Sequence, residues 1–300
     1  MKQIVVISGK GGTGKTSLVA SFASLSRRAV LADCDVDAAD LHLVLNPIVK
    51  SSEEYSGGLM AYIDPDLCSG CGFCTEVCRF DAIIETPTAE GENSTLFYID
   101  PLKCEGCGVC AYYCPEKAIK MFERKSGEVY ISEMKYGPMV HAQLGIAEEN
   151  SGKLVAQVRE EATKLAQEGD YDYIIIDGPP GVGCPVISSI TGADIVLIVT
   201  EPTVSGLSDL ERVAQLARHF KIPSAVCVNK WDINPENTDS ILDYCENHNI
   251  KILGKIHYDR TFTEAQIRKV PALEVASSDL KKEIVSVWER LNRELENHNK

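Results

Sequence analysis

The sequence lacks the features that would place the protein in a membrane or on nucleic acid. No apolar run approaches the roughly 20 residues that a membrane-spanning helix needs. The N-terminal apolar stretch Ile4–Ile7 is too short for a secretory signal peptide. Basic residues are in deficit, since 30 Lys and Arg against 44 Asp and Glu give a formal net charge of −14. Because such an acidic surface repels phosphate backbones and anionic lipids, we expect a cytoplasmic protein with no nucleic acid or membrane partner.

The composition is otherwise that of a globular protein. Of 300 residues, 44% are hydrophobic and 25% charged, which excludes a disordered or collagen-like chain. The chain is long enough for one large domain or two modest ones. Cysteine is the exception, because twelve are present and a reducing cytoplasm does not keep close-set cysteines as disulfides.

Eight of the twelve cysteines form two runs of identical spacing, C-x2-C-x2-C-x3-C. Such crowding indicates a bound metal. Zinc sites usually pair two C-x2-C knuckles across a longer gap, whereas three close cysteines plus a remote fourth are typical of a [4Fe–4S] cluster. The eight residues are Cys68, Cys71, Cys74, Cys78, Cys104, Cys107, Cys110 and Cys114.

The two runs belong to an internal repeat, in which IDPDLCSGCGFC from Ile63 returns as IDPLKCEGCGVC from Ile99. The segment resembles a bacterial-type two-cluster ferredoxin domain, although Arg79 stands where proline is usual. In such ferredoxins the fourth cysteine of each run ligates the other cluster. The resemblance implies one cluster on Cys68, Cys71, Cys74 and Cys114, and a second on Cys104, Cys107, Cys110 and Cys78. The alternatives are two zinc knuckles, or iron–sulfur clusters that have only a structural role and hold a loop in place.

A glycine-rich loop, GKGGTGKT, follows the apolar N-terminal stretch. It matches G-x-x-x-x-G-K-[ST] between a predicted strand and a predicted helix (17–26), the context that the motif requires. Loop N–H groups and the helix dipole bind phosphates. Lys15 should reach the β- and γ-phosphates and Thr16 should give its hydroxyl to Mg²⁺. The expected nucleotide-binding residues are Gly11, Gly12, Thr13, Gly14, Lys15, Thr16 and Ser17.

The second lysine of the loop, Lys10, makes it resemble the deviant Walker A motif of the MinD/ParA family, which includes the nitrogenase iron protein and the Mrp-type cluster carriers. The resemblance covers residues 1–50 and about 127–300. In that family the extra lysine reaches across a homodimer to the nucleotide of the other subunit. The resemblance therefore implies a catalytic role for Lys10, together with Lys15, in a homodimer or a heterodimer with a related ATPase.

Three more residues follow in the family's order, each after an apolar stretch. Asp35 lies where the family's switch I aspartate orients or deprotonates the attacking water. Asp177, in Asp-Gly-Pro-Pro-Gly, lies in switch II and would hold Mg²⁺ through water. Asn229 lies where the family reads the adenine edge. A polar residue at a strand end is often only a cap. None of the three residues therefore indicates the family alone, whereas their occurrence in the family's order does.

Apolar stretches alternate with segments of helical periodicity along the rest of the chain. Nearly continuous Ile and Val runs favour a parallel sheet covered on both faces. The predicted class is α/β: a doubly wound, mostly parallel P-loop NTPase sheet with an inserted α+β bacterial-type ferredoxin domain, and nucleotide at the carboxyl ends of the strands. The predicted strands are 4–7, 29–32, 173–176, 195–199, 225–228 and 250–256. The expected bounds are 1–56 and 126–300 for the ATPase domain and 57–125 for the insert.

The four remaining cysteines and the C-terminal segment carry less weight. Cys34, Cys227 and Cys245 read as ordinary buried or helical residues. Cys184 follows Asp177 at the spacing of a cluster ligand in the nitrogenase iron protein, but 136–152 contains no second cysteine to match. The segment 279–297 has one apolar helical face with mixed charges, which favours core packing over membrane binding.

Three functions are compatible with these motifs. The first is an ATPase that couples slow hydrolysis and dimer switching to electron transfer through two [4Fe–4S] clusters, with a redox protein as partner. The second is an ATP-dependent assembly or carrier protein that passes an iron–sulfur or other metallocluster to an acceptor protein, although the C-terminal C-x-x-C of Mrp-type scaffolds is missing. The third is a ParA-like positioning protein.

Overall fold

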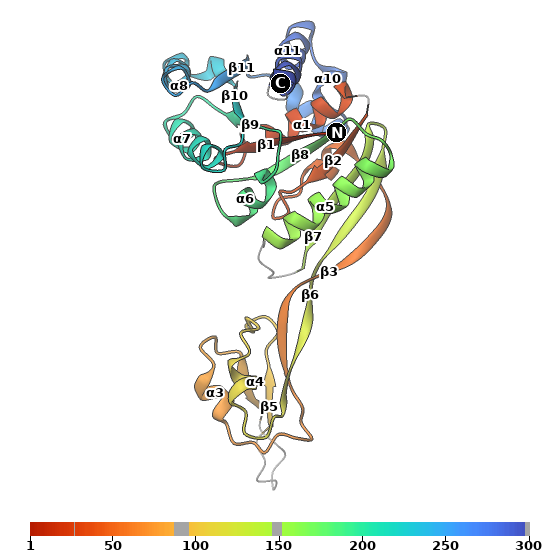
Figure 1. Ribbon diagram of the computed structural model, residues 1–300, viewed down its shortest axis with the longest axis vertical. Helices are drawn as coiled ribbons and strands as arrows, with labels where there is room; N and C mark the ends of the chain where they lie inside the picture. The colour runs from red at the N-terminus through yellow and green to blue at the C-terminus, as the bar shows by residue number, and fades with distance from the viewer. Residues whose placement is uncertain (27, 87–95, 146–151, 298–300) are drawn as a thin grey trace. The chain divides into compact units, whose positions relative to one another are not determined.

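The computed structural model describes residues 1–26, 28–86, 96–145 and 152–297. The chain divides into two compact units, labelled by element in Figure 1. Unit 1 comprises Met1–Glu53, Glu128–Leu144 and Glu149–Lys300, and unit 2 comprises Glu54–Gly127 and Gly145–Glu148. Both cysteine runs lie in unit 2. Within the described ranges, no helix combines the length and apolarity needed to span a membrane.

Unit 1 is built on a sheet whose strands from β11 to β7 pair in parallel. The prediction of an α/β fold with a mostly parallel sheet is confirmed, because all six predicted apolar stretches are strands of this sheet. The last two strands in the order, β6 and β3, each have residues in both units. The order is β11 (Lys251–Ile256), β10 (Ser224–Asn229), β9 (Ile195–Thr200), β1 (Lys2–Ser8), β8 (Tyr173–Pro180), β2 (Ala29–Asp33), β7 (Gly137–Leu144), β6 (Ile119–Met134) and β3 (Ile48–Ile63).

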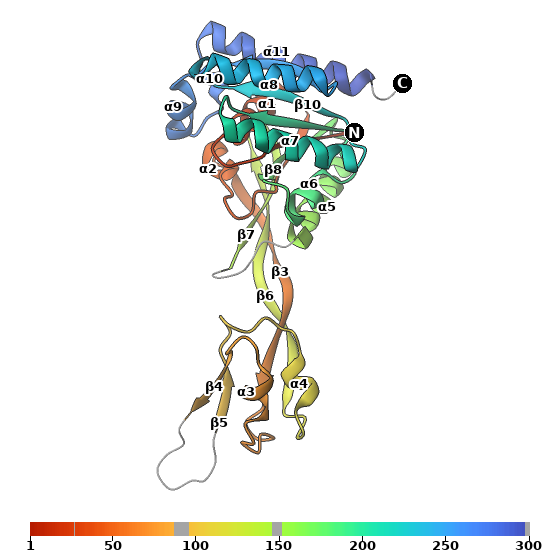
Figure 2. The ribbon, with the colours of Figure 1, turned by 90° about the vertical axis from the view of Figure 1, so that its left-hand side faces the viewer.

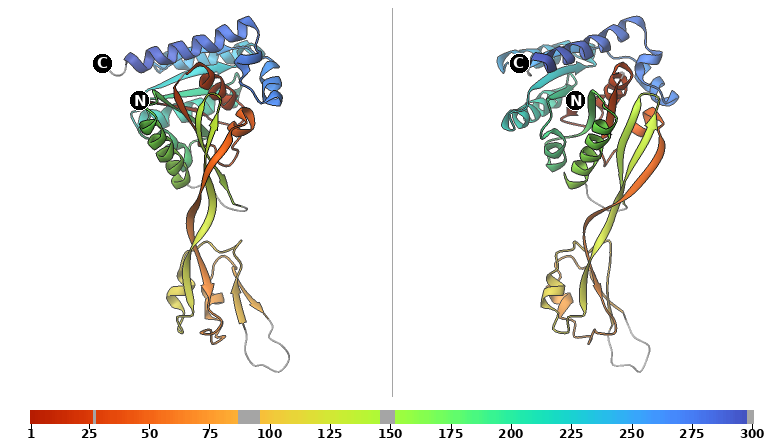
Figure 3. Two further views of the ribbon diagram at one scale, coloured as in Figure 1. Left: turned by 90° about the vertical axis from the view of Figure 1, so that its right-hand side faces the viewer. Right: turned by 45° about the vertical axis from the view of Figure 1, so that its right-hand side comes forward.

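Helices cover both faces of this sheet, as a doubly wound fold requires. The face with α1 also carries the C-terminal helix, and the other face carries α5, α6 and α7. Figure 2 and the left view of Figure 3 each show both layers, with the C-terminal helix along the top. The helices of unit 1 are α1 (Lys15–Leu25), α2 (Leu41–Leu45), α5 (Gly152–Glu168), α6 (Cys184–Ile190), α7 (Val204–His219), α8 (Pro235–Asn247), α9 (Thr261–Arg268), α10 (Ala272–Val275) and α11 (Ser278–Asn297), with a 3-10 turn η1 (Trp231–Ile233).

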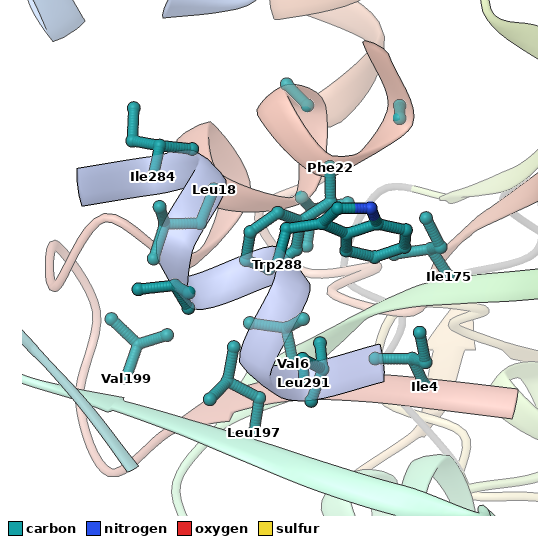
Figure 4. Close-up of a cluster of buried hydrophobic side chains, with 14 of the residues drawn as sticks. Ile4, Val6, Leu18, Phe22, Ile175, Leu197, Val199, Ile284, Trp288 and Leu291 are labelled. Atoms are coloured by element: carbon teal, nitrogen blue, oxygen red, sulfur yellow. The ribbon is translucent and has the colours of Figure 1, made fainter. Parts of the chain in front are cut away.

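The C-terminal helix α11 packs into the core by the apolar face that its sequence predicts. Its six apolar residues at helical spacing are all buried, and Trp288 lies 5.2 Å from Phe22 of α1 between ring centroids (Figure 4). These contacts bring the two helices together over β1. The core-packing interpretation of this helix is therefore confirmed. Cys34 and Cys227, expected to be small buried side chains, are each fully buried, and so is Cys245 in its helix.

Helical periodicity predicts two helices over 209–219 and 238–247, and both begin earlier in the structure because polar residues cap them. The Thr203 side chain accepts a hydrogen bond from the Gly206 N–H at 2.9 Å, so α7 begins at Val204. Asn234 caps α8 in the same way, through the Asn237 N–H at 3.0 Å. Ser, Thr and Asn side chains at such positions satisfy N–H groups that a helix leaves unpaired.

Unit 2 repeats one small motif twice. Each half contains a short helix, α3 (Phe73–Val77) or α4 (Val109–Tyr113), that follows a glycine with positive φ and ends at the fourth cysteine of its run. The two helices pack against each other, and the antiparallel pair β4 (Ile83–Thr86) and β5 (Leu96–Ile99) lies in the same unit (Figure 2). Cysteines of both runs face one apolar core.

Candidate nucleotide site and cysteine cavity

The glycine-rich loop is fixed by a contact that only glycine allows. Gly14 has φ +91°, and a Cβ there would lie 2.4 Å from Asn229 Nδ2. Asn229, at the end of β10, donates from Nδ2 to the Thr13 carbonyl at 2.8 Å. A side chain at position 14 would therefore be strained and would meet Asn229, and the hydrogen bond to Thr13 joins the expected adenine-reading residue to the loop.

Three buried carboxylates surround the loop lysine. Parallel pairing sets Asp33 of β2 opposite Asp177 of β8, because both strands end at the same edge of the sheet. Lys15 Nζ lies 2.5 Å from Asp35 Oδ2 and 3.7 Å from Asp177 Oδ1. The structure therefore brings together the loop lysine and the expected switch I and switch II aspartates.

This group is unbalanced in charge, with one ammonium among three acids. Burial alone would lower the pKa of Lys15, but the charges of Asp177, Asp35 and Asp33 outweigh it and raise that pKa. Burial raises the pKa of Asp177 to about 6, against the opposing charge of Lys15. Burial also raises the pKa of Asp33 and of Asp35, and Lys15 again opposes the shift. The site therefore favours a cation in addition to Lys15.

Asp177 provides the test of whether the residues fit a magnesium nucleotide. It is 1% exposed, and neither carboxylate oxygen accepts a hydrogen bond of normal length from the described residues, although Thr16 and Lys15 lie near enough to lower its pKa in part. A buried carboxylate that accepts no close hydrogen bond is costly, even with Lys15 at 3.7 Å, and carboxylate oxygens are ligands that Mg²⁺ prefers. The Asp177 oxygens next to Lys15 and Thr16 therefore fit a divalent cation that accompanies a bound polyphosphate.

Asp33 positions the loop that carries Asp35. Its carboxylate accepts from the Asp35 N–H and from the Leu41 N–H, each at 3.2 Å. These bonds tie the strand end to the start of α2. Asp33 thus has a structural task in this chain as well as its proximity to the charge of Lys15.

The second loop lysine, Lys10, lies on its own chain against residues that sequence reasoning missed. Its Nζ is 2.6 Å from Glu201 Oε1. Glu201 also pairs with Lys230 Nζ at 3.1 Å. The signal that could have found Glu201 was its place directly after the predicted strand at 195–199, at the edge where the other site residues gather.

In unit 2, a cavity is lined by cysteines of both runs. Its walls include Ile63, Phe97 and Ile119. The cysteines in its lining are Cys68, Cys71, Cys74 and Cys114. This is the set that the ferredoxin resemblance implies for one cluster, including the exchanged fourth cysteine.

The other four cysteines also gather across the two runs. Burial raises the pKa of Cys110, and the charges of Cys104, Cys107 and Cys78 add to the rise. Cys78 therefore lies close to the second run, as the implied exchange requires. Gly106, between two of these cysteines, has φ +63°, and a Cβ there would lie 2.0 Å from the Leu59 carbonyl oxygen.

The donor set in unit 2 fits iron–sulfur clusters in its chemistry. All eight cysteines are free thiols, and thiolates in sets of four are the ligands of [4Fe–4S] clusters. Among the described residues, no group of three Cys, His, Asp or Glu side chains is spaced for a single metal ion. A cubane binds each thiolate through a different iron, so its ligands need not meet at one point. Cys184 lies elsewhere, exposed at the start of α6 in unit 1.

Comparisons with known proteins cover most of the chain. The protein-family model described as the CobQ/CobB/MinD/ParA nucleotide binding domain matches residues 4–272 of this sequence. An uncharacterised protein of Methanocaldococcus jannaschii is 35% identical over 238 residues, which span 78% of this chain and 80% of that protein.

Two further comparisons are more distant. The iron-sulfur cluster carrier protein of Pyrococcus furiosus is 24% identical over 158 residues, 48% of this chain and 53% of its own length. The structure of a MinC:MinD cell division protein complex from Aquifex aeolicus matches 97% of this chain and 95% of that chain with a TM-score of 0.58 at 21% identity. The last similarity shows the fold alone.

Proposed function

This chain belongs to the CobQ/CobB/MinD/ParA nucleotide-binding family, and from that membership we propose that it is an ATPase that couples nucleotide binding and slow hydrolysis to electron transfer through two [4Fe–4S] clusters. ATP and Mg²⁺ would bind in unit 1, and the clusters in unit 2. The observation that carries the proposal is the cavity lined by Cys68, Cys71, Cys74 and Cys114, in a chain that also buries Lys15 among three aspartates.

In the nucleotide half, each residue has a task that its surroundings support. Lys15 is held by Asp35 at 2.5 Å and would exchange this carboxylate for the β- and γ-phosphates. The exchange would free Asp35 to orient or deprotonate the attacking water. Asp177 would hold Mg²⁺ with Thr16, and Asn229 would face the adenine edge while it keeps the loop carbonyl of Thr13 in place.

The bound nucleotide is proposed to influence the clusters by controlling dimer formation. The dimer would form with a second copy of this chain or with a related ATPase. Lys10 would then act on the nucleotide of the other subunit. The loop that carries Asp35 is tied to β2 by Asp33, so a change of partner at Lys15 would move residues that follow directly on this strand. A redox protein would exchange electrons with the cysteine-bound groups of unit 2.

The clusters would supply one-electron redox chemistry when bound. The chain's own contribution is an apolar cluster, formed by Ala61, Ile63 and Ile119, against which cysteines of both runs pack. Iron–sulfur potentials depend on solvent exposure and on hydrogen bonds to the sulfurs. A nucleotide-driven shift of ~200 mV for one electron corresponds to roughly a 2,000-fold difference in affinity between nucleotide states.

The second candidate is an ATP-dependent carrier of iron–sulfur or other metalloclusters. It is favoured by the 24% identity to the Pyrococcus furiosus cluster carrier. That similarity covers about half of either chain. A carrier binds its cluster as cargo, so the two functions differ in how firmly the iron is held.

A chelator challenge separates the two functions. The protein is purified without oxygen, its iron is counted, and bathophenanthroline is added with ADP or with ATP. Electron transfer predicts roughly eight iron atoms per chain, as two clusters of four require, and their retention in both nucleotides. ATP-dependent loss of iron, together with its appearance in an apo-acceptor, would favour the carrier and contradict electron transfer.

A further inference from the structure

The Lys10 ammonium is fully engaged within its own chain. Its Nζ lies 2.6 Å from Glu201 Oε1. It also donates to Ser205 Oγ at 3.1 Å and to Thr203 Oγ1 at 3.2 Å. An ammonium has three N–H donors, so these three acceptors match its capacity. The side chain is nevertheless 31% exposed, and a competing acceptor can therefore approach it.

Glu201 is the charge on which this arrangement depends. Burial opposes ionisation of its carboxyl, but the hydrogen bonds and charges of Lys10 and Lys230 outweigh burial and lower its pKa. Lys230 Nζ in turn donates to the Gly12 carbonyl at 3.1 Å. The Glu201 carboxylate thus pairs with both lysines, and Lys230 in turn contacts the backbone of the glycine-rich loop.

The other two acceptors of Lys10 lie at the start of α7, where a cation is disfavoured. Thr203 is the N-cap of this helix, and the N-terminus of a helix carries a partial positive charge. Without an anion nearby, the helix end would repel the Lys10 ammonium. Glu201 supplies that anion, so the hydroxyls of Thr203 and Ser205 alone should not hold the lysine.

We infer that Glu201 is a positioning residue that keeps Lys10 on its own subunit until the nucleotide phosphates of a second copy of this chain compete for the ammonium. The inference rests on the proposed ATP-dependent dimer. A triphosphate carries more negative charge than one carboxylate, so it can displace Glu201. The contact therefore sets how much protein is needed before dimers form.

The first test measures whether Glu201 holds the lysine. The full-length, cluster-loaded protein without nucleotide is methylated reductively, and the rate at Lys10 is read by peptide mass spectrometry against Lys282, which is 77% exposed. Glu201→Gln should raise the methylation rate of Lys10 about threefold, which corresponds to the free energy of a partly exposed ion pair. Glu133→Gln is the matched control, because it removes an exposed pair with Lys50 at 2.9 Å. An unchanged Lys10 rate in Glu201→Gln overturns the inference.

The second test measures the restraint on dimer formation by sedimentation with a non-hydrolysable ATP analogue. A symmetric dimer releases two copies of Lys10, so a threefold effect in each subunit multiplies to about a ninefold lower dimer dissociation constant in Glu201→Gln. Glu201→Asp keeps the charge and should stay closer to the wild type, which a change due only to altered packing would not do.

The outcomes separate the inference from the function on which it rests. If the wild type dimerises and Glu201→Gln needs as much protein or more, the restraint is refuted and the dimer stands. If neither protein dimerises although both bind the analogue, the proposed dimer is refuted and the restraint with it.

Discussion

Replacement of Asp177 by asparagine should stabilise the nucleotide-free protein while it removes the magnesium-dependent part of nucleotide binding. Asp177 is 1% exposed, and its oxygens accept no hydrogen bond of normal length from the described residues; the nearby Thr16 and Lys15 offset only part of the effect of burial on its pKa. Its nearest cation, Lys15, is 3.7 Å away and is engaged more closely by Asp35. The asparagine side chain would remove the charge and keep the shape.

The magnitude follows from the raised pKa of Asp177, which burial moves from 3.8 to about 6. A carboxyl whose pKa is higher in the folded state binds more protons there, so its ionisation destabilises the fold above that pKa. The shift corresponds to about 3 kcal/mol above ~pH 7. The advantage of Asp177→Asn should shrink as pH falls through the folded pKa, to under about 1 kcal/mol near pH 4.

Tryptophan fluorescence during denaturant unfolding is the assay, because Trp231 and Trp288 both lie in unit 1. Nucleotide-free wild type and Asp177→Asn are compared across this pH range, and then with ATP and Mg²⁺. With MgATP present the order should reverse, since the wild type gains binding energy that the variant lacks. A variant that is less stable than the wild type at neutral pH without nucleotide would refute this account of the carboxylate cluster.

Three further predictions concern the loop lysine, the exchanged cysteines and the adenine-facing residue. Lys10→Ala should lower ATP hydrolysis at least about tenfold while ATP binding changes little, as expected for a group that acts only on the reacting phosphates; unaffected turnover would rule out the dimer mechanism. Cys114→Ser should disturb the cluster signal shared with the first cysteine run and spare the other, by electron paramagnetic resonance, whereas Cys78→Ser should do the reverse. The opposite pattern, in which each change disturbs its own run, would contradict the exchange. Asn229→Ala should weaken ATP binding by about 1–3 kcal/mol, because it loses the adenine contact and leaves the Thr13 carbonyl unpaired; calorimetry showing equal affinity for ATP and GTP in the wild type would contradict its role.

Much of the sheet could be predicted because its strands are continuous apolar runs. Each buried run in unit 1, such as 195–199, is followed by a polar residue at the carboxyl end, and parallel pairing brings these ends together. The proximity of Asp35, Asp177 and Asn229 to the loop that carries Lys15 follows from this rule. The set of cysteines that lines the cavity was likewise implied by the resemblance to two-cluster ferredoxins, which the spacing of the two runs carries.

What the sequence could not reveal depends on contacts between distant residues. The strand β7 reads GPMVHAQL, whose proline and polar residues hide a strand that pairs with β2. The partner of Lys10 was missed for a similar reason. A lone glutamate after a strand has no pattern of its own, and only the fold shows that Glu201 reaches both Lys10 and Lys230.

The most direct test of nucleotide-coupled electron transfer is a redox titration of the cluster-loaded protein, followed by electron paramagnetic resonance, in ADP and in a non-hydrolysable ATP analogue. If nucleotide state and cluster state belong to one mechanism, the midpoint potential of at least one cluster should differ by about 100–200 mV between the two nucleotides, at 59 mV per tenfold change in affinity. Identical potentials in both nucleotides, with unchanged electron transfer to a redox partner, would contradict it.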